Sequence, residues 1–118
     1  MEIEQLSAYL DEVLLADYLD RLGKNIIEQM FALYSQQVVI YLNDIEKAQQ
    51  VDSKTDWQTS CHKMKGATAS VGMRKLHLQL KTLEKINATQ QEKSVMLADL
   101  KALNEASTLA FNTWLASI

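Results

Sequence analysis

The chain has 118 residues, a net charge of −3, no proline, three glycines and one cysteine. This length fits one domain that buries a core without staples, and a single cysteine excludes an internal disulfide and suits a reducing compartment. Abundant Leu, Ala, Gln, Glu and Lys favour an all-α protein. The N-terminus has no signal-peptide pattern, and the longest apolar run, residues 38–42, is too short to span a bilayer.

Apolar residues recur at helical spacing along most of the chain. Residues 1–22 suggest short helices that pack across one end of a bundle. Four longer helices are expected after them, over residues 24–50, 54–71, 73–87 and 90–117. Because the connections are short, we predict an up-and-down antiparallel four-helix bundle, with residues 1–118 forming a single domain.

Two pairs of polar residues mark where helices begin. Ser53 precedes Asp56 by three residues, and Thr89 precedes Glu92 by three, the spacing of a capping box. Gly72 closes the helix before it in a left-handed C′ position.

The inward face of each helix follows from steps of three and four residues. These apolar stripes predict a core, not a ligand box. Their members are Ile27, Met30, Phe31, Tyr34, Val38, Leu42 and Ile45, then Met73, Leu76, Leu80 and Leu83, and finally Met96, Leu100, Leu103, Ala110 and Trp114.

The helix over residues 54–71 carries the most informative stretch. Its buried seam is expected to contain Trp57, Cys61, Met64, Thr68 and Val71. The next side chain along from Cys61, that of His62, is turned about 100° from this seam and should point outward.

Three residues share the outward stripe of His62, namely Lys65, Gly66 and Ala69. Glycine inside an exposed helix costs about 1 kcal/mol relative to alanine, so it needs a reason. Clearance is one, because Gly66 and Ala69 leave room for another protein to approach the imidazole. An imidazole that is largely neutral at pH 7 offers a nucleophilic nitrogen, and the ammonium of Lys65 can pair with an anion on that ring. The stripe has the parts of a phosphoryl acceptor.

The pattern His62-x-x-Lys65-Gly66-Ala67-Thr68-x-x-Val71-Gly72 resembles the histidine-containing phosphotransfer (HPt) domains of bacterial phosphorelays. It is most similar to those that end hybrid sensor kinases of the ArcB and TorS kind. Thr68 departs from the Ala or Ser usual in the family. The resemblance implies that His62 is the phosphoacceptor, and that Glu84, on the following helix, holds the far nitrogen of its ring.

The resemblance also implies a function. The chain would be a phosphocarrier that takes a phosphoryl group from the aspartate of one receiver domain and passes it to the aspartate of a response-regulator receiver. It would have no ATP site of its own, and the sequence has no Gly-rich phosphate loop. Mg²⁺ would be supplied by the receiver. We expect a cytoplasmic monomer without nucleic acid or direct membrane contact, either free-standing or as the end of an inner-membrane-anchored sensor kinase.

Charge is distributed unevenly along the chain. Residues 1–62 carry a net charge of −7, residues 63–85 carry +5, and the rest carry −1. The basic segment contains Lys63, Lys65, Arg74, Lys75, Lys81 and Lys85. It lacks the interleaved aromatic residues of nucleic-acid sites, so a partner with an acidic pocket fits it better. We predict a docking surface formed by Lys63, Gly66, Ala69 and Arg74.

Other interpretations remain open. A four-helix adaptor could bind a partner through the basic face without chemistry, with His62 incidental. A metal-binding bundle ranks lower, since His62 and His77 have no ligand partners at suitable spacing. A catalytic Cys61-His62 pair is disfavoured because adjacent helical residues point in different directions. No role is assigned to His77.

Overall fold

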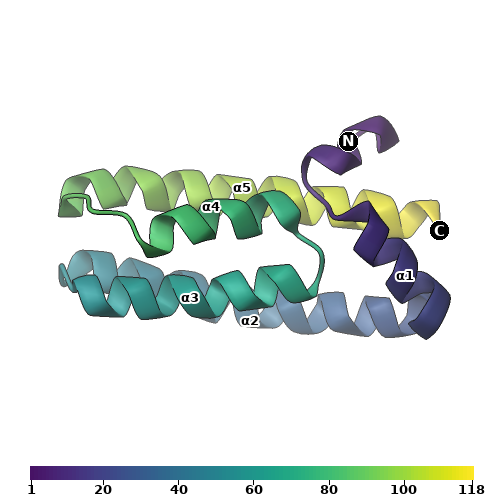
Figure 1. The fold of residues 1–118 in the computed structure, drawn as a ribbon, viewed down its shortest axis with the longest axis horizontal. Helices are drawn as coiled ribbons and strands as arrows, with labels where there is room; N and C mark the ends of the chain where they lie inside the picture. The colour runs from purple at the N-terminus through teal and green to yellow at the C-terminus, as the bar shows by residue number, and fades with distance from the viewer.

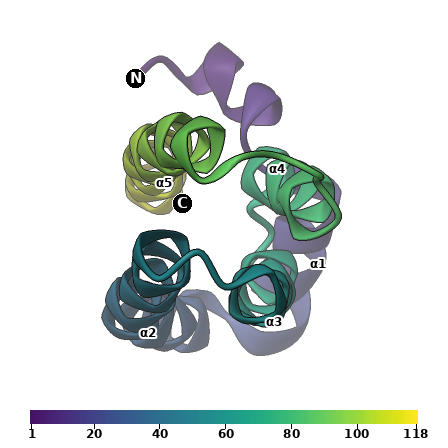
Figure 2. The same ribbon diagram turned by 90° about the vertical axis from the view of Figure 1, so that its left-hand side faces the viewer.

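The computed structural model describes residues 1–118, and all its regular structure is helical. A short 3₁₀ helix, η1, precedes five α-helices; the elements are η1 (Ile3–Ala8), α1 (Glu12–Leu22), α2 (Lys24–Gln50), α3 (Lys54–Ser70), α4 (Arg74–Glu84) and α5 (Gln90–Ser117). The helices α2 to α5 form the predicted antiparallel four-helix bundle (Figures 1 and 2). In it, α3 packs against α2 and α4, and α5 closes the ring against the same two helices.

The four bundle helices differ in length, which shapes the two ends of the molecule. Helices α2 and α5 have 27 and 28 residues, whereas α3 and α4 have 17 and 11. The long pair therefore extends beyond the turn between α3 and α4, and α1 lies across this end (Figure 1). The element η1 packs against α5. The predicted placement of the N-terminal helices at one end of the bundle is confirmed.

Gly72 closes α3 as predicted and also meets α1. Its φ of 72° is the left-handed region, and Met73 N–H donates to the Thr68 carbonyl at 3.0 Å, as in a Schellman motif. A Cβ on Gly72 would lie 3.0 Å from the side chain of Leu15 in α1. The Gly72 carbonyl accepts from Asp11 N–H at 2.8 Å. The glycine is therefore required twice, by the turn and by the close approach of α1.

The caps form as predicted, but α4 is shorter than expected. Ser53 Oγ accepts from Asp56 N–H, and Thr89 with Glu92 forms a complete capping box. However, α4 ends at Glu84 and not at residue 87. In place of a further α-helical turn, the Leu83 carbonyl accepts from Ile86 N–H at 3.3 Å and from Trp57 Nε1–H at 2.9 Å. The helices α3 and α4 also lie one residue inside their predicted shared boundary, at Ser70 and Arg74.

Most residues of the predicted core faces are buried, but Met30, Phe31 and Leu42 of α2 are only partly buried. One cluster of 21 buried apolar residues fills the bundle. Along α5, Leu97 and Phe111 are buried, while the predicted Met96 and Leu103 are only partly so. Met96 and Leu97 are adjacent, and Leu103 and Phe111 are about two turns apart, so helical spacing alone could not decide which member of either pair is buried. The same face buries two polar residues, Lys93 and Ser107.

Candidate functional site

Helix α3 has the buried side and the exposed side that the sequence predicts. Trp57, Cys61, Met64 and Thr68 are buried, whereas the side chain of His62 is 67% exposed. Burial, and after it the negative charge of Glu84, raise the pKa of the Cys61 thiol to about 12, against an opposing effect of Lys93. This thiol stays protonated at neutral pH, so Cys61 is not a nucleophile.

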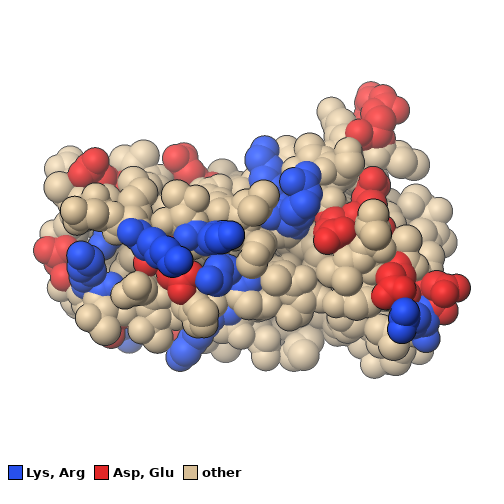
Figure 3. Space-filling model, viewed as in Figure 1, with Lys and Arg blue, Asp and Glu red and all other residues tan.

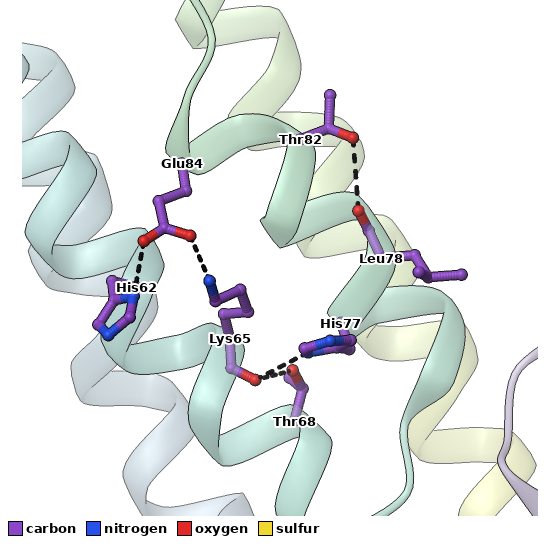
Figure 4. Close-up of polar contacts among 7 residues, drawn as sticks. All are labelled: His62, Lys65, Thr68, His77, Leu78, Thr82 and Glu84. Atoms are coloured by element: carbon purple, nitrogen blue, oxygen red, sulfur yellow. Dashed lines mark hydrogen bonds and ion pairs between the residues drawn. The ribbon is translucent and has the colours of Figure 1, made fainter.

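Glu84 bridges the two polar residues of the outward stripe. It is the last residue of α4, and the antiparallel packing of α4 on α3 places it beside His62 (Figure 4). One carboxylate oxygen lies 2.6 Å from His62 Nδ1, and the other lies 2.5 Å from Lys65 Nζ. The Glu84 side chain is only 10% exposed. A carboxylate thus sits under the imidazole on the protein side of the ring.

This contact fixes which nitrogen of His62 is available. A carboxylate only accepts hydrogen bonds, so Nδ1 carries the proton and donates. The lone pair then belongs to Nε2, on the far side of the ring. The hydrogen bond from Lys65 is the largest effect on the pKa of Glu84 and lowers it; burial opposes it, and the hydrogen bond from His62 and the charges of both partners lower the pKa further. Glu84 is therefore ionised at neutral pH.

The side chain of Lys65 is more constrained than the sequence suggests. The sequence predicts a mobile ammonium that is available to an incoming anion, but the Lys65 side chain is only 21% exposed and is paired with Glu84. An ammonium has three donors, so the pair leaves others for a second acceptor. Lys65 lies on the outward stripe of α3 as predicted. Its ion pair with Glu84 of α4 could not be predicted from the spacing of residues on α3.

Nothing within the molecule requires a glycine at position 66. A Cβ at this position would meet no atom within 4 Å, and the backbone is ordinary helix. Gly66 and Lys63 line a groove of about 300 Å³ between α2 and α3, together with Met30, Leu33 and Tyr41 of α2. Two of the four predicted docking residues thus lie along an open, largely apolar groove.

The other two predicted docking residues line a second hollow. Ala69 of α3 and Arg74 of α4 border a depression of about 220 Å³ shared with His77. Arg74 is exposed, but its Nη2 also donates to the Ser7 carbonyl at 2.6 Å, which ties η1 to α4. Gly66 and Ala69, one turn apart on the stripe of His62, therefore border two different hollows.

The basic segment forms one face of the molecule. Figure 3 shows lysine and arginine gathered over α3 and α4, whereas acidic side chains gather over α1 and the N-terminal region. All six basic residues of this segment are at least partly exposed, and Glu84 is its one acid. Basic side chains therefore predominate on the face formed by α3 and α4.

His77, for which the sequence predicts no role, contacts the site from α4. Its Nδ1 lies 3.2 Å from the Lys65 carbonyl, which also accepts from Thr68 Oγ1 at 2.8 Å (Figure 4). His77 is two helical turns before Glu84, so both project from the same face of α4. That spacing was the one signal in the sequence that could have drawn attention to it.

No group of three or more His, Cys, Asp or Glu side chains is placed to hold a metal ion. None of the helices is both long enough and apolar enough to cross a membrane.

Comparisons with known proteins give a structural match. No family model matches the sequence, and no curated protein matches it either. Among solved structures, the chain is similar to the histidine-containing phosphotransfer domain of ArcB from Escherichia coli, with 23% sequence identity and a TM-score of 0.86. The match covers 96% of this chain and 98% of that one. The chain therefore has the fold of an HPt domain over nearly its whole length.

Proposed function

We propose that this protein is a phosphocarrier that accepts a phosphoryl group on His62 and passes it on. One observation carries the proposal: an exposed imidazole whose Nδ1–H is held by a nearly buried carboxylate, leaving Nε2 free. The fold shared with the phosphotransfer domain of ArcB supports it.

The chemistry needs little from this chain beyond orientation. The Nε2 lone pair of His62 attacks the phosphorus of a partner's aspartyl phosphate in line. As the Nε2–P bond forms, the bond from phosphorus to the aspartate oxygen breaks, and the aspartate leaves as a carboxylate. Nδ1 keeps its proton, so the ring becomes cationic directly beside Glu84. The ionised carboxylate stabilises that charge, and the reverse reaction on a second aspartate discharges the ring.

Lys65 has two parts in this scheme. It holds Glu84 ionised and in place before transfer. When the phosphoryl group arrives one helical turn away, the remaining donors of the ammonium are available to its oxygens. The outward stripe thus adds one positive charge on the side where negative charge arrives.

The partners are proposed to be receiver domains of a hybrid sensor kinase and of a response regulator. Their phosphorylation sites are acidic, and the basic face over α3 and α4 would speed and orient docking. The groove lined by Lys63 and Gly66 extends this surface toward α2. We propose that the receiver supplies Mg²⁺ and the catalytic groups, that this chain is a carrier without its own ATP site, and that it works in the cytoplasm.

The test is transfer of labelled phosphate from phosphorylated receiver domains in the presence of Mg²⁺. Label should appear on this protein in an acid-labile, alkali-stable form, as expected of phosphohistidine. His62→Gln should abolish uptake, and His77→Gln, which changes the other histidine, should retain it. Label that persists in folded His62→Gln contradicts the assignment. Failure with a broad panel of receivers would favour the adaptor without chemistry.

A further inference from the structure

Trp57 contacts the end of α4 that carries Glu84. It lies on α3, five residues before His62, and is buried. Its indole Nε1–H donates to the Leu83 carbonyl at 2.9 Å, and this hydrogen bond is inside the core. The last carbonyls of a helix have no partner within it, so Trp57 satisfies one of them for α4. The residue that follows this carbonyl is Glu84.

The indole hydrogen bond adds to two other contacts at this end of α4, the burial of Leu83 in the core and the ion pair of Glu84 with Lys65. Residues 86–89 have no regular structure, and the covalent link to α3 is the turn at Gly72, at the other end of α4. Ten residues of helix separate Arg74 from Glu84, a rise of about 15 Å. A hydrogen bond fails when its atoms separate by about 0.5 to 1 Å, so a small shift of this end would detach Glu84 from His62.

The indole is itself held from a third helix. Lys93 of α5 is 5% exposed, and its Nζ lies 5.1 Å from the centre of the Trp57 ring. No carboxylate pairs with this ammonium, which instead lies over the face of the indole ring. The contacts join α3, α4 and α5 behind the site. We refer to Trp57, Lys93 and the Leu83 carbonyl as the tryptophan clamp.

We propose that Trp57 is a positioning residue for phosphoryl transfer: the tryptophan clamp holds Glu84 where it can accept from Nδ1 of His62, and so keeps Nε2 as the nucleophile. Trp57 acts through Glu84 and touches no reacting atom. The importance of Trp57 for phosphoryl transfer rests on the proposed function, but the effect of Trp57 on the tautomer of His62 can be measured without any transfer.

The first measurement is the tautomer of neutral His62, read from imidazole ¹⁵N chemical shifts. The wild type should show the Nδ1–H form, and Glu84→Gln supplies the spectrum of a ring without the carboxylate. Trp57→Phe should shift His62 away from the Nδ1–H form. Trp114→Phe makes the same change at a buried site near the C-terminal end of α5, where the indole N–H has no recorded acceptor, and should leave His62 as in the wild type.

The second measurement is the rate of phosphoryl transfer. Trp57→Phe should slow it about five- to tenfold, the ratio expected for one net hydrogen bond. In a Glu84→Gln background the same change should have no further effect, because Trp57 acts through Glu84. A merely structural tryptophan would lower the melting temperature in either background without changing the tautomer.

A third variant covers the case in which Trp57→Phe does not fold. In Trp114→Phe protein, tryptophan is replaced during expression by its benzothienyl analogue, where sulfur stands for the indole N–H with nearly the same shape. An unchanged His62 tautomer in this protein overturns the proposal. If the wild type accepts no phosphoryl group, the proposed function fails, and the tautomer comparison still decides whether the clamp exists.

Discussion

Replacing Gly66 should strengthen the fold and weaken the function. Gly66 lies within α3, and a Cβ there would meet no atom within 4 Å. Gly66→Ala should therefore gain nearly the whole difference in helix propensity, about 1 kcal/mol, without steric cost. For a domain of this size, that gain raises the melting temperature by roughly 3 to 6 °C. Thermal unfolding followed by circular dichroism measures it.

A longer side chain separates the two effects. Gly66→Gln should also be at least as stable as the wild type, because glutamine favours helix over glycine. However, its side chain would stand in the groove beside Lys63 and close to the imidazole. If a partner must reach His62 across this surface, the transfer rate should fall about tenfold or more, equivalent to about 1.4 kcal/mol of lost docking. The transfer rate of Gly66→Ala should lie between those of the wild type and Gly66→Gln.

The control places the same side chain elsewhere. Ala102→Gln adds glutamine at an exposed position of α5, a helix that contributes no residue to the groove beside Gly66. Its transfer rate should match the wild type. Wild-type transfer by folded Gly66→Gln would refute the clearance argument. A lower melting temperature for Gly66→Ala would show instead that the fold itself requires the glycine.

Three further predictions concern the groups around His62. The pKa of Glu84 is lowered in the folded state, so its stabilising contribution should be complete above its unfolded-state pKa of about 4.3 and lost as the pH falls through the lower folded value. The difference in unfolding free energy between wild type and Glu84→Gln, from urea titrations, should thus be present at pH 7 and shrink toward zero in acid; a constant difference would contradict this. Lys65→Met should slow transfer several-fold and raise the pKa of Glu84, which a ¹³C carboxyl titration would follow, and an unshifted titration would show that Lys65 does not govern this carboxylate. His77→Ala should cost about 1 kcal/mol of stability through the lost bond to the Lys65 carbonyl, with His62 still phosphorylated; equal stability would mean that this bond contributes nothing.

Much of this site depends on local patterns, which is why the sequence predicts it well. The helical spacing of Cys61, Met64 and Thr68 turns His62 outward whatever the rest of the chain does. Capping pairs such as Thr89 with Glu92 lie within one turn and form as expected. Glu84 came from resemblance to the family and not from spacing, since one glutamate on a helix is by itself only a solvated charge.

The sequence by itself therefore determined the helices, their inward faces and the exposure of His62, because each follows from residues three or four apart. The tertiary structure decided which distant groups meet. Glu84 reaches His62 across 22 residues and Trp57 reaches Leu83 across 26, and both contacts depend on the register of α4 on α3. The same packing engaged the ammonium of Lys65 and buried Lys93 against Trp57. Such contacts are set by how whole helices pack, and no local spacing encodes them.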